Sequence, residues 1–125
     1  MSSARIEVDG VVGVRRALRK VGVEAADLRK AHKEAAGLVA DAAQVFVPRR
    51  SGRLAGTIRA AGQVGAGVVR AGRASVPYAG VIHFGWADRG IAPRPFLYDA
   101  ADKRADEVRD LYAARLQSIA RRSGL

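Results

Sequence analysis

A long amphipathic helix is the strongest structural signal in this sequence, and any fold of the chain has to cover its apolar stripe. The small alanines in the stripe permit close approach of a second helix or of a sheet. Asp27 lies in the expected first turn, where the helix dipole favours negative charge, and Pro48 ends the helix because the residue before a proline is pushed out of the α region. Over residues 24–46, apolar side chains recur at spacings of three and four: Leu28, Ala31, Ala35, Leu38, Val39, Ala42, Val45 and Phe46.

Short runs on both sides of this helix are typical of strands. Residues 4–9 alternate apolar and polar, which predicts a strand with Ile6 and Val8 on its buried face. After a breaker loop at residues 48–53, residues 54–59 alternate again, and a glycine-rich run follows at 64–72. With a turn near Gly62 and Gln63, the two runs predict an antiparallel hairpin.

The rest of the pattern predicts three further segments. A short helix is expected over residues 11–20, and a final helix over residues 97–121. The apolar run 78–84 is too short to assign by periodicity, and residues 85–95 form a long loop. The inner stripe of the final helix is expected at Ala101, Ala105, Val108, Leu111, Tyr112, Arg115 and Ile119.

This order of elements predicts the fold class. We expect an α+β fold in which a small antiparallel sheet packs against the long helix and the C-terminal helix. A chain of 125 residues has the size of one domain, so residues 1–125 are expected to form a single domain. No apolar run approaches the roughly 18 residues of a spanning helix, and the N-terminal residues lack the apolar stretch of a signal peptide. We therefore expect no membrane association.

Residues that could carry catalysis or bind a metal are few. The absence of cysteine excludes a disulfide scaffold, a thiolate metal site and a cysteine nucleophile. His32 lies within the long helix without the spacing of a zinc motif, and is interpreted as an ordinary helix residue. His83, between Ile82 and Phe84, is interpreted as a packed or interface imidazole. The sequence predicts no enzyme, no catalytic residues, no metal and no cofactor.

The positive charge of the chain points instead to an anionic partner. The sequence holds 22 basic and 12 acidic residues, a net charge of +10, and Asp88 is the only carboxylate side chain between residues 51 and 98. Phosphate contact requires only such cations and gives affinity without sequence choice. The candidates for contact with DNA or with an acidic protein are Arg49, Arg50, Arg53, Arg59, Arg70 and Arg73.

Three short motifs occur in a recognisable order. They are Pro48-Arg-Arg-Ser51-Gly52-Arg53-Leu54, then Tyr78-Ala79-Gly80-Val81-Ile82-His83-Phe84-Gly85, then Ala92-Pro93-Arg94-Pro95-Phe96-Leu97-Tyr98-Asp99-Ala100. Together they resemble the bacteriophage neck or minor tail-component family of siphophages, whose pattern is Pro-x-x-(Thr/Ser)-Gly-x-Leu, Tyr-Ala-x-x-x-(Glu/His)-x-Gly and Pro-Phe-Leu-x-x-Ala. Ser51 stands where the family usually has threonine, and His83 where it often has glutamate.

The resemblance implies a structural virion protein of the head–tail connector. Such a neck or tail-completion protein forms a homo-oligomeric ring, of six or twelve copies, between the capsid portal complex and the tail, and DNA passes through it without sequence specificity. The candidate arginines would then face the lumen of the ring or an acidic neighbouring ring. The implied partners are head-completion, adaptor or stopper proteins and the tail terminator or tail-tube protein. The protein would be assembled in the host cytoplasm and reside in the virion. The alternatives are a tail terminator that caps the tail tube, a small basic nucleic-acid-binding protein, and an enzyme or toxin-like accessory.

Most residues of the three motifs are interpreted as stabilising the fold of the domain. Ser51 and Gly52 redirect the chain after Pro48, because serine can bond nearby backbone and glycine accepts a positive φ. Phe96 is expected in the core, near Leu38 and Ala42. Gly85 is expected to allow a reversal of the backbone after Phe84, and Leu54, Tyr78, Ala79 and Pro95 are also interpreted as residues that serve the folding of the domain.

The long loop, by contrast, is interpreted as a contact surface. At eleven residues, 85–95 exceeds the usual connection of about 4–6 residues, and such loops tend to be functional or mobile. Protein interfaces are enriched in tryptophan and arginine. We therefore predict that this loop contacts a neighbouring subunit or an adjacent ring through Trp86, Arg89, Ile91 and Arg94. The alternative is that Trp86 folds back over its own sheet.

Overall fold

The computed structural model describes residues 4–8, 25–49 and 52–122, and confirms the α+β fold class. Two short 3-10 turns, η1 (Ala55–Thr57) and η2 (Ala87–Arg89), interrupt the connections. The helices and strands are β1 (Ala4–Val8), α2 (Ala25–Phe46), β2 (Arg59–Gly62), β3 (Gly67–Ala71), α3 (Ala79–Phe84) and α4 (Phe96–Arg122).

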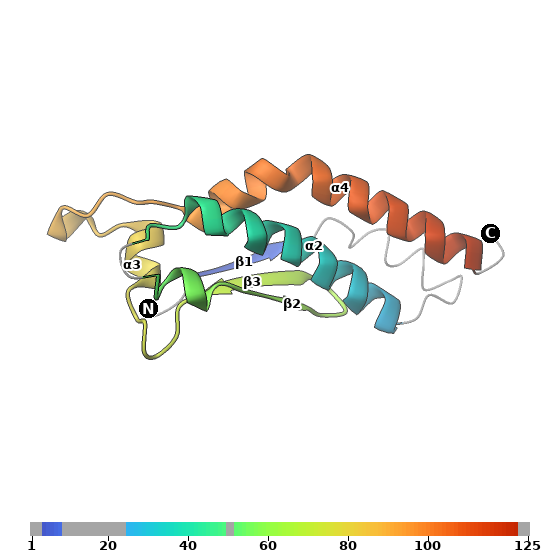
Figure 1. Cartoon of the computed structure of the whole chain (residues 1–125), viewed down its shortest axis with the longest axis horizontal. Helices are drawn as coiled ribbons and strands as arrows, with labels where there is room; N and C mark the ends of the chain where they lie inside the picture. The colour runs from blue at the N-terminus through green and yellow to red at the C-terminus, as the bar shows by residue number, and fades with distance from the viewer. Residues whose placement is uncertain (1–3, 9–24, 50–51, 123–125) are drawn as a thin grey trace.

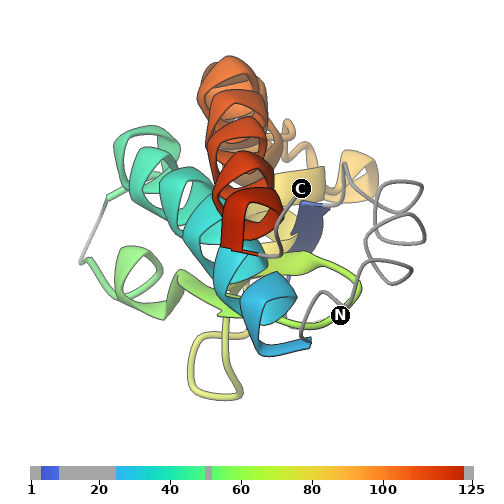
Figure 2. The same ribbon diagram turned by 90° about the vertical axis from the view of Figure 1, so that its right-hand side faces the viewer.

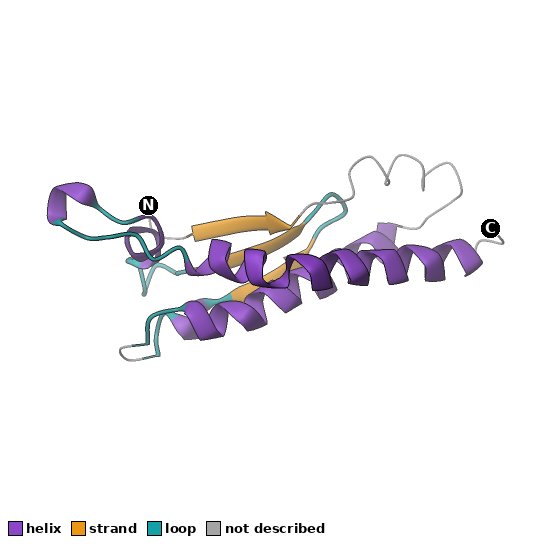
Figure 3. Ribbon diagram, turned by 90° about the horizontal axis from the view of Figure 1, so that it is seen from above, coloured by secondary structure: helices purple, strands orange, loops and turns teal. Residues whose placement is uncertain are grey.

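The three strands form an antiparallel sheet in the order β1-β3-β2. Helix α2 covers one face of this sheet, and α4 packs along α2 in the opposite direction (Figures 1 and 2). The molecule is elongated along its two long helices, and α3 with the loop that follows it lies at one end (Figure 3). The predicted hairpin is confirmed as β2 and β3, and the two long helices lie where the apolar stripes predict them.

Two paired glycines explain how α2 lies so close to the hairpin. Gly62 and Gly67 are partners in the β2–β3 ladder. A Cβ atom on Gly67 would come within 2.5 Å of the carbonyl oxygen of His32, and one on Gly62 would overlap the carbonyl oxygen of Arg29. These glycines of the hairpin therefore lie where the backbone of α2 approaches the sheet.

The core lies between α2, the sheet and the start of α4. Its largest members are fully buried, among them Val39, Val69, Phe96 and Leu97. Phe96 is 1% exposed and belongs to the same cluster as Ala42, which confirms its predicted burial, whereas Leu38 is only half-buried. Burial of these side chains removes apolar surface from water, the main favourable term in folding.

Several sequence predictions are wrong in detail, and one segment that the sequence pattern leaves open is assigned by the structure. Residues 54–58 precede the strand rather than belonging to it, because the Thr57 hydroxyl donates to the Leu54 carbonyl oxygen at 2.6 Å and closes a 3-10 turn. The apolar run 78–84, which the sequence pattern left unassigned, forms the short helix α3. Val45 and Phe46 are 81% and 37% exposed, although Ala43 and Val47 beside them are buried, so they lie on the outward side of the last turn of α2. Ala105 is exposed on α4.

Some predictions concern residues outside the described parts of the chain. These are the short helix at 11–20 and the residues Arg50 and Ser51. The strand predicted at 4–9 is present over residues 4–8, but the side chains of Ile6 and Val8 are not among those described.

Candidate functional site

Two of the three sequence motifs, the first and the second, meet at one apolar pocket, and Ile91 of the long loop joins them. Its volume is about 680 Å³, and its lining comes from the end of α2, the turn before η1, the helix α3 and the loop after it. The lining residues are Pro48, Gly52, Leu54, Tyr78, Val81, Ile82 and Ile91. Residues more than 40 positions apart in the sequence are therefore brought to one place, which the sequence did not indicate.

Glycine and backbone hydrogen bonds place α3 beside this pocket. Gly85 adopts a φ of 77°, and its N–H donates to the Val81 carbonyl oxygen at 2.7 Å, so the chain reverses there as predicted. A Cβ atom at Gly85 would come within 2.8 Å of the Ile91 carbonyl oxygen. The N–H of Arg94 donates to the Ile82 carbonyl oxygen at 2.9 Å and holds the returning strand of the loop against α3.

The loop itself is ordered by a small bridge. Trp86 and Ile91 exchange both backbone hydrogen bonds, at 2.9 and 3.0 Å. The Arg89 guanidinium lies 5.0 Å from the centroid of the Trp86 ring, a cation–π contact. Trp86 is nevertheless 45% exposed, and the loop projects from the end of the molecule (Figure 3). The alternative in which Trp86 folds back over the sheet is therefore not the arrangement in this structure.

Several large hydrophobic side chains gather around the pocket and the loop, and we call this surface the aromatic end. Each is between 37% and 46% exposed, and a monomer gains little from such exposure. They come from three neighbouring segments: the residue before α3 and its last turn, the loop, and the first turn of α4. The members of the aromatic end are Tyr78, Phe84, Trp86, Ile91 and Tyr98.

His83 lies beneath the aromatic end and is 1% exposed. Its ring makes edge-on contacts with Phe84 and Tyr98, each at 4.5 Å between centroids, and with Phe96 at 5.2 Å. Neither ring nitrogen has a hydrogen-bond partner within the described residues. Burial lowers the pKa of His83, while the Asp99 carboxylate acts in the opposite direction. His83 is therefore a packed imidazole, as the sequence predicts.

The structure separates the candidate arginines into different places. Arg49 donates to the side chain and the carbonyl oxygen of Gln44 at the end of α2, and Arg53 donates to the Ser75 carbonyl oxygen. Arg49 and Arg53 therefore each stabilise a turn by hydrogen bonds. The remaining described members, Arg59, Arg70 and Arg73, lie together at the end of the hairpin, and we call them the arginine cluster.

Arg59 and Arg70 are direct partners in the β2–β3 ladder. Both lie three residues from a glycine that faces α2, so by the alternation of a strand they lie on the face away from that helix. Arg59 donates to the carbonyl oxygens of Thr57 and Gly72, at 2.8 and 2.9 Å. Its pKa is lowered by burial, and further by the positive charges of Arg73 and Arg70. Among the described residues, no carboxylate pairs with the cluster.

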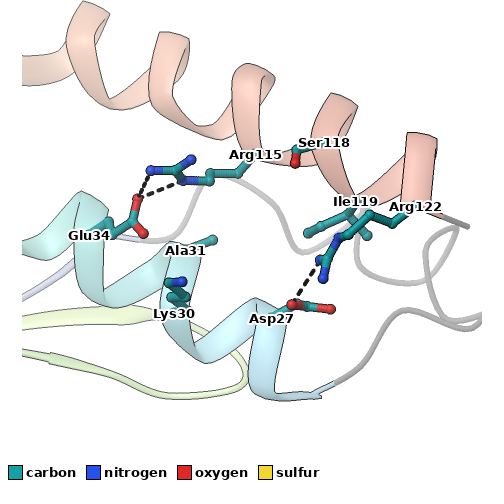
Figure 4. A pocket seen from close by; sticks show the side chains of 8 residues that line it. All are labelled: Asp27, Lys30, Ala31, Glu34, Arg115, Ser118, Ile119 and Arg122. Atoms are coloured by element: carbon teal, nitrogen blue, oxygen red, sulfur yellow. Dashed lines mark hydrogen bonds and ion pairs between the residues drawn. The ribbon is translucent and has the colours of Figure 1, made fainter.

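A second, polar pocket of about 310 Å³ lies between α2 and α4. Arg115 and Arg122 reach from α4 to Glu34 and Asp27 on α2, at 2.6 and 2.9 Å (Figure 4). Exposed pairs of this kind contribute about 0–1 kcal/mol each. We interpret this pocket as the seam that fixes the two helices, because its carboxylates are already paired.

Sequence reasoning missed one residue beside this seam. His32 is 1% exposed, and its Nδ1 atom lies 2.6 Å from the Tyr112 hydroxyl oxygen. The sequence does indicate that His32 is buried. It follows Leu28 by four positions and precedes Ala35 by three, which places it on the apolar stripe of the helix.

The described residues include neither a cluster that could bind a metal ion nor a membrane-spanning helix. Within the described parts of the chain, no three His, Asp or Glu side chains are grouped closely enough to hold a metal ion. None of the described helices combines the length and the apolar character needed to cross a membrane. Comparison with protein-family models, curated proteins and solved structures gave no match.

Proposed function

We propose that this protein is a structural, non-enzymatic component of the bacteriophage head–tail connector, a neck or tail-completion protein that forms a ring in the virion. The observation that carries the proposal is the convergence of the motifs. Pro48, Gly52 and Leu54 of the first motif meet Tyr78 of the second at one open apolar pocket. Leu54 is buried in the core, but Gly52 and Tyr78 are exposed, and the pocket opens beside the exposed aromatic end.

The aromatic end supports the assembly part of the proposal. Tyrosine, tryptophan, phenylalanine and arginine are enriched at protein interfaces, where the fully buried centre is apolar and the rim polar. Trp86 and Arg89 stand next to the apolar pocket, with Ile91 belonging to both loop and pocket. We assign this surface to contact with a neighbouring subunit or an adjacent ring.

The placement of both histidines supports the non-enzymatic part. His32 and His83 are each 1% exposed and packed against aromatic rings, so neither is positioned to reach a substrate. A general base has to lie within hydrogen-bond reach of the proton that it abstracts.

The test is the assembly state of the purified protein. Light scattering after size exclusion, followed by two-dimensional cryo-EM class averages, is expected to show a symmetric ring of six or twelve copies. A strictly monomeric protein, both alone and in the presence of tailless phage heads carrying the portal complex, contradicts the proposal. Labelling in the intact virion separates a neck position from the tail terminator position.

The arginine cluster favours a second candidate function, a small basic nucleic-acid-binding protein. Its three guanidinium groups have no carboxylate partner among the described side chains, as expected of a phosphate-contacting surface. Monomeric protein that binds duplex DNA with a steep salt dependence would favour this candidate over the connector.

A further inference from the structure

The exposed side of α4 carries a row of carboxylates. The aspartates follow one another at spacings of three, four and four residues, which places them on one face of the helix. All four aspartates are exposed, and one lysine, Lys103, lies between the second and the third of them. Asp106 pairs with the exposed Arg109, and no ion pair within the described residues engages the other three. We call this row the aspartate stripe: Asp99, Asp102, Asp106 and Asp110.

The arginine cluster is positively charged, whereas the aspartate stripe is negatively charged. Like charges directly opposite each other on neighbouring strands destabilise a sheet, and here Arg59 faces Arg70. The register also places Arg5 of β1 on the other side of Arg70, so three arginines occupy one level of the sheet. The side chains of Arg70 and Arg73 make no hydrogen bond or ion pair with any described residue. An anionic surface brought to this face would relieve that repulsion.

The two surfaces match in spacing as well as in charge. Aspartates four residues apart on a helix are about 6 Å apart along its axis. Arginines on neighbouring strands are about 5 Å apart across the sheet. A helix laid across the end of the hairpin would therefore bring two successive carboxylates to Arg59 and Arg70. The hydrogen bonds from Arg59 to two carbonyl oxygens hold one of these groups in place before any partner arrives.

The two surfaces also lie on different sides of the molecule. Arg59 and Arg70 of the cluster are on the sheet face away from α2, and the aspartate stripe is on the exposed side of α4, which packs on α2. The two long helices and the sheet are seen end-on in Figure 2. A two-fold dimer through either surface would bring like charges together. Contact between the cluster of one copy and the stripe of the next repeats in one direction, and closes into a ring when the rotation between copies allows it.

We propose that the arginine cluster of one copy binds the aspartate stripe of the next copy, and that this contact joins neighbouring subunits laterally. The inference rests on the proposed function and deepens it. The aspartate stripe runs from the first turn of α4 to its middle, whereas the loop that carries Trp86 projects from the end of the molecule (Figure 3). The aromatic end is then left to an axially adjacent partner.

Charge reversal with mixing tests the proposal. Arg70→Glu/Arg73→Glu reverses the cluster, and Asp102→Arg/Asp110→Arg reverses the stripe; none of these four side chains is in an ion pair with a described residue. Each double variant alone is expected to raise the protein concentration needed for assembly by about tenfold or more. An equimolar mixture restores assembly, because each chain then meets a neighbour of opposite charge on both sides. Circular dichroism checks that each variant is folded.

A matched control separates the specific contact from net charge. Arg29→Glu/Lys33→Glu changes the net charge by the same amount as the cluster variant, on exposed residues of α2, and is expected to assemble like the unmodified protein. Failure of the control to assemble, or failure of the mixture to restore assembly, overturns the proposal.

The remaining outcomes identify which claim fails. If the unmodified protein forms rings and both charge variants do so equally well, the lateral contact is wrong and the connector proposal stands. If the cluster variant assembles normally but loses binding to a duplex DNA oligonucleotide, the partner of the cluster is nucleic acid. If the unmodified protein never assembles, with or without portal-bearing heads, both proposals are wrong.

Discussion

The Nδ1 atom of His32 lies 2.6 Å from the hydroxyl oxygen of Tyr112 in the buried layer between α2 and α4. The two rings meet nearly edge-on, with 5.5 Å between their centroids. This contact joins residues 80 positions apart and fixes the register of the two long helices. The ion pairs at Glu34 and Asp27 lie on the same seam but are partly exposed, so they contribute less to the free energy of unfolding.

Tyr112→Phe removes the hydroxyl and keeps the ring. We expect the free energy of unfolding to fall by about 1–3 kcal/mol, because a buried polar atom of His32 loses a hydrogen-bond partner. Urea denaturation measures the change. Tyr98→Phe is the matched control, since Tyr98 is 46% exposed and should tolerate the same change. Equal stability of the two variants would contradict a structural role for the His32–Tyr112 contact.

Gly62→Ala tests the close approach of α2 to the hairpin. A Cβ atom there overlaps the Arg29 carbonyl oxygen and comes within 2.8 Å of the Lys33 backbone nitrogen. Because both neighbours belong to the helix backbone, the helix has to shift, and we expect a loss of about 1–3 kcal/mol. Gly56→Ala is the control, because a Cβ atom at Gly56 meets nothing within 4 Å. Thermal melts of the two variants should differ by several degrees.

The long elements could be predicted because each carries its own periodic signal. The stripe from Leu28 to Ala42 and the stop at Pro48 are local features, and they define α2 in the structure as they do in the sequence. The glycines of the hairpin likewise predict a turn between two strands. They do not say what approaches them, and only the structure shows that the backbone of α2 does.

The candidate site was less predictable because it depends on tertiary proximity. Pro48, Tyr78 and Ile91 line one pocket, yet nothing in their own segments indicates that they meet. The six-residue helix α3 is shorter than two helical turns, so its periodicity cannot separate it from a strand. The arginines illustrate the same limit: they were grouped by sequence, whereas local hydrogen bonds hold Arg49 and Arg53 at turns away from the cluster.

Phe96→Ala truncates the anchor at the start of α4. Phe96 is 1% exposed and contacts the ring of His83, and we expect a loss of about 3–5 kcal/mol, as for other buried aromatic truncations. A domain of this size has a total stability of about 5–15 kcal/mol, so the variant should be close to unfolding at 37 °C. Phe84→Ala, at a residue 46% exposed, is the control. Unchanged stability of Phe96→Ala would instead make the Pro-Phe-Leu motif a docking surface.

The pH dependence of stability should report on His83. Burial lowers its pKa in the folded state below the ordinary value of about 6.5, so the unfolded chain binds a proton more readily. The stabilisation is complete above pH 6.5 and is lost as the pH falls towards the lowered pKa, by at most about 1.4 kcal/mol per pH unit. His83→Phe keeps an aromatic ring among Phe84, Phe96 and Tyr98 and removes the titration. Equal pH profiles of the two proteins in urea denaturation would contradict this role.

Trp86→Ala tests the assignment of the aromatic end to assembly. Trp86 is 45% exposed and is held by the bridge to Ile91 and by Arg89, so its removal should leave the fold intact by circular dichroism. Because interface tryptophans commonly contribute 2 kcal/mol or more, we expect roughly a thirtyfold loss of affinity for its partner, and failure to join heads with tails in an in vitro assembly reaction. Val45→Ala is the control, since Val45 is the most exposed of the described large hydrophobic residues, at 81%, and lies outside the aromatic end. A Trp86→Ala variant that unfolds shows that the ring serves the monomer, and one that joins heads with tails at the normal rate shows that the contact lies elsewhere.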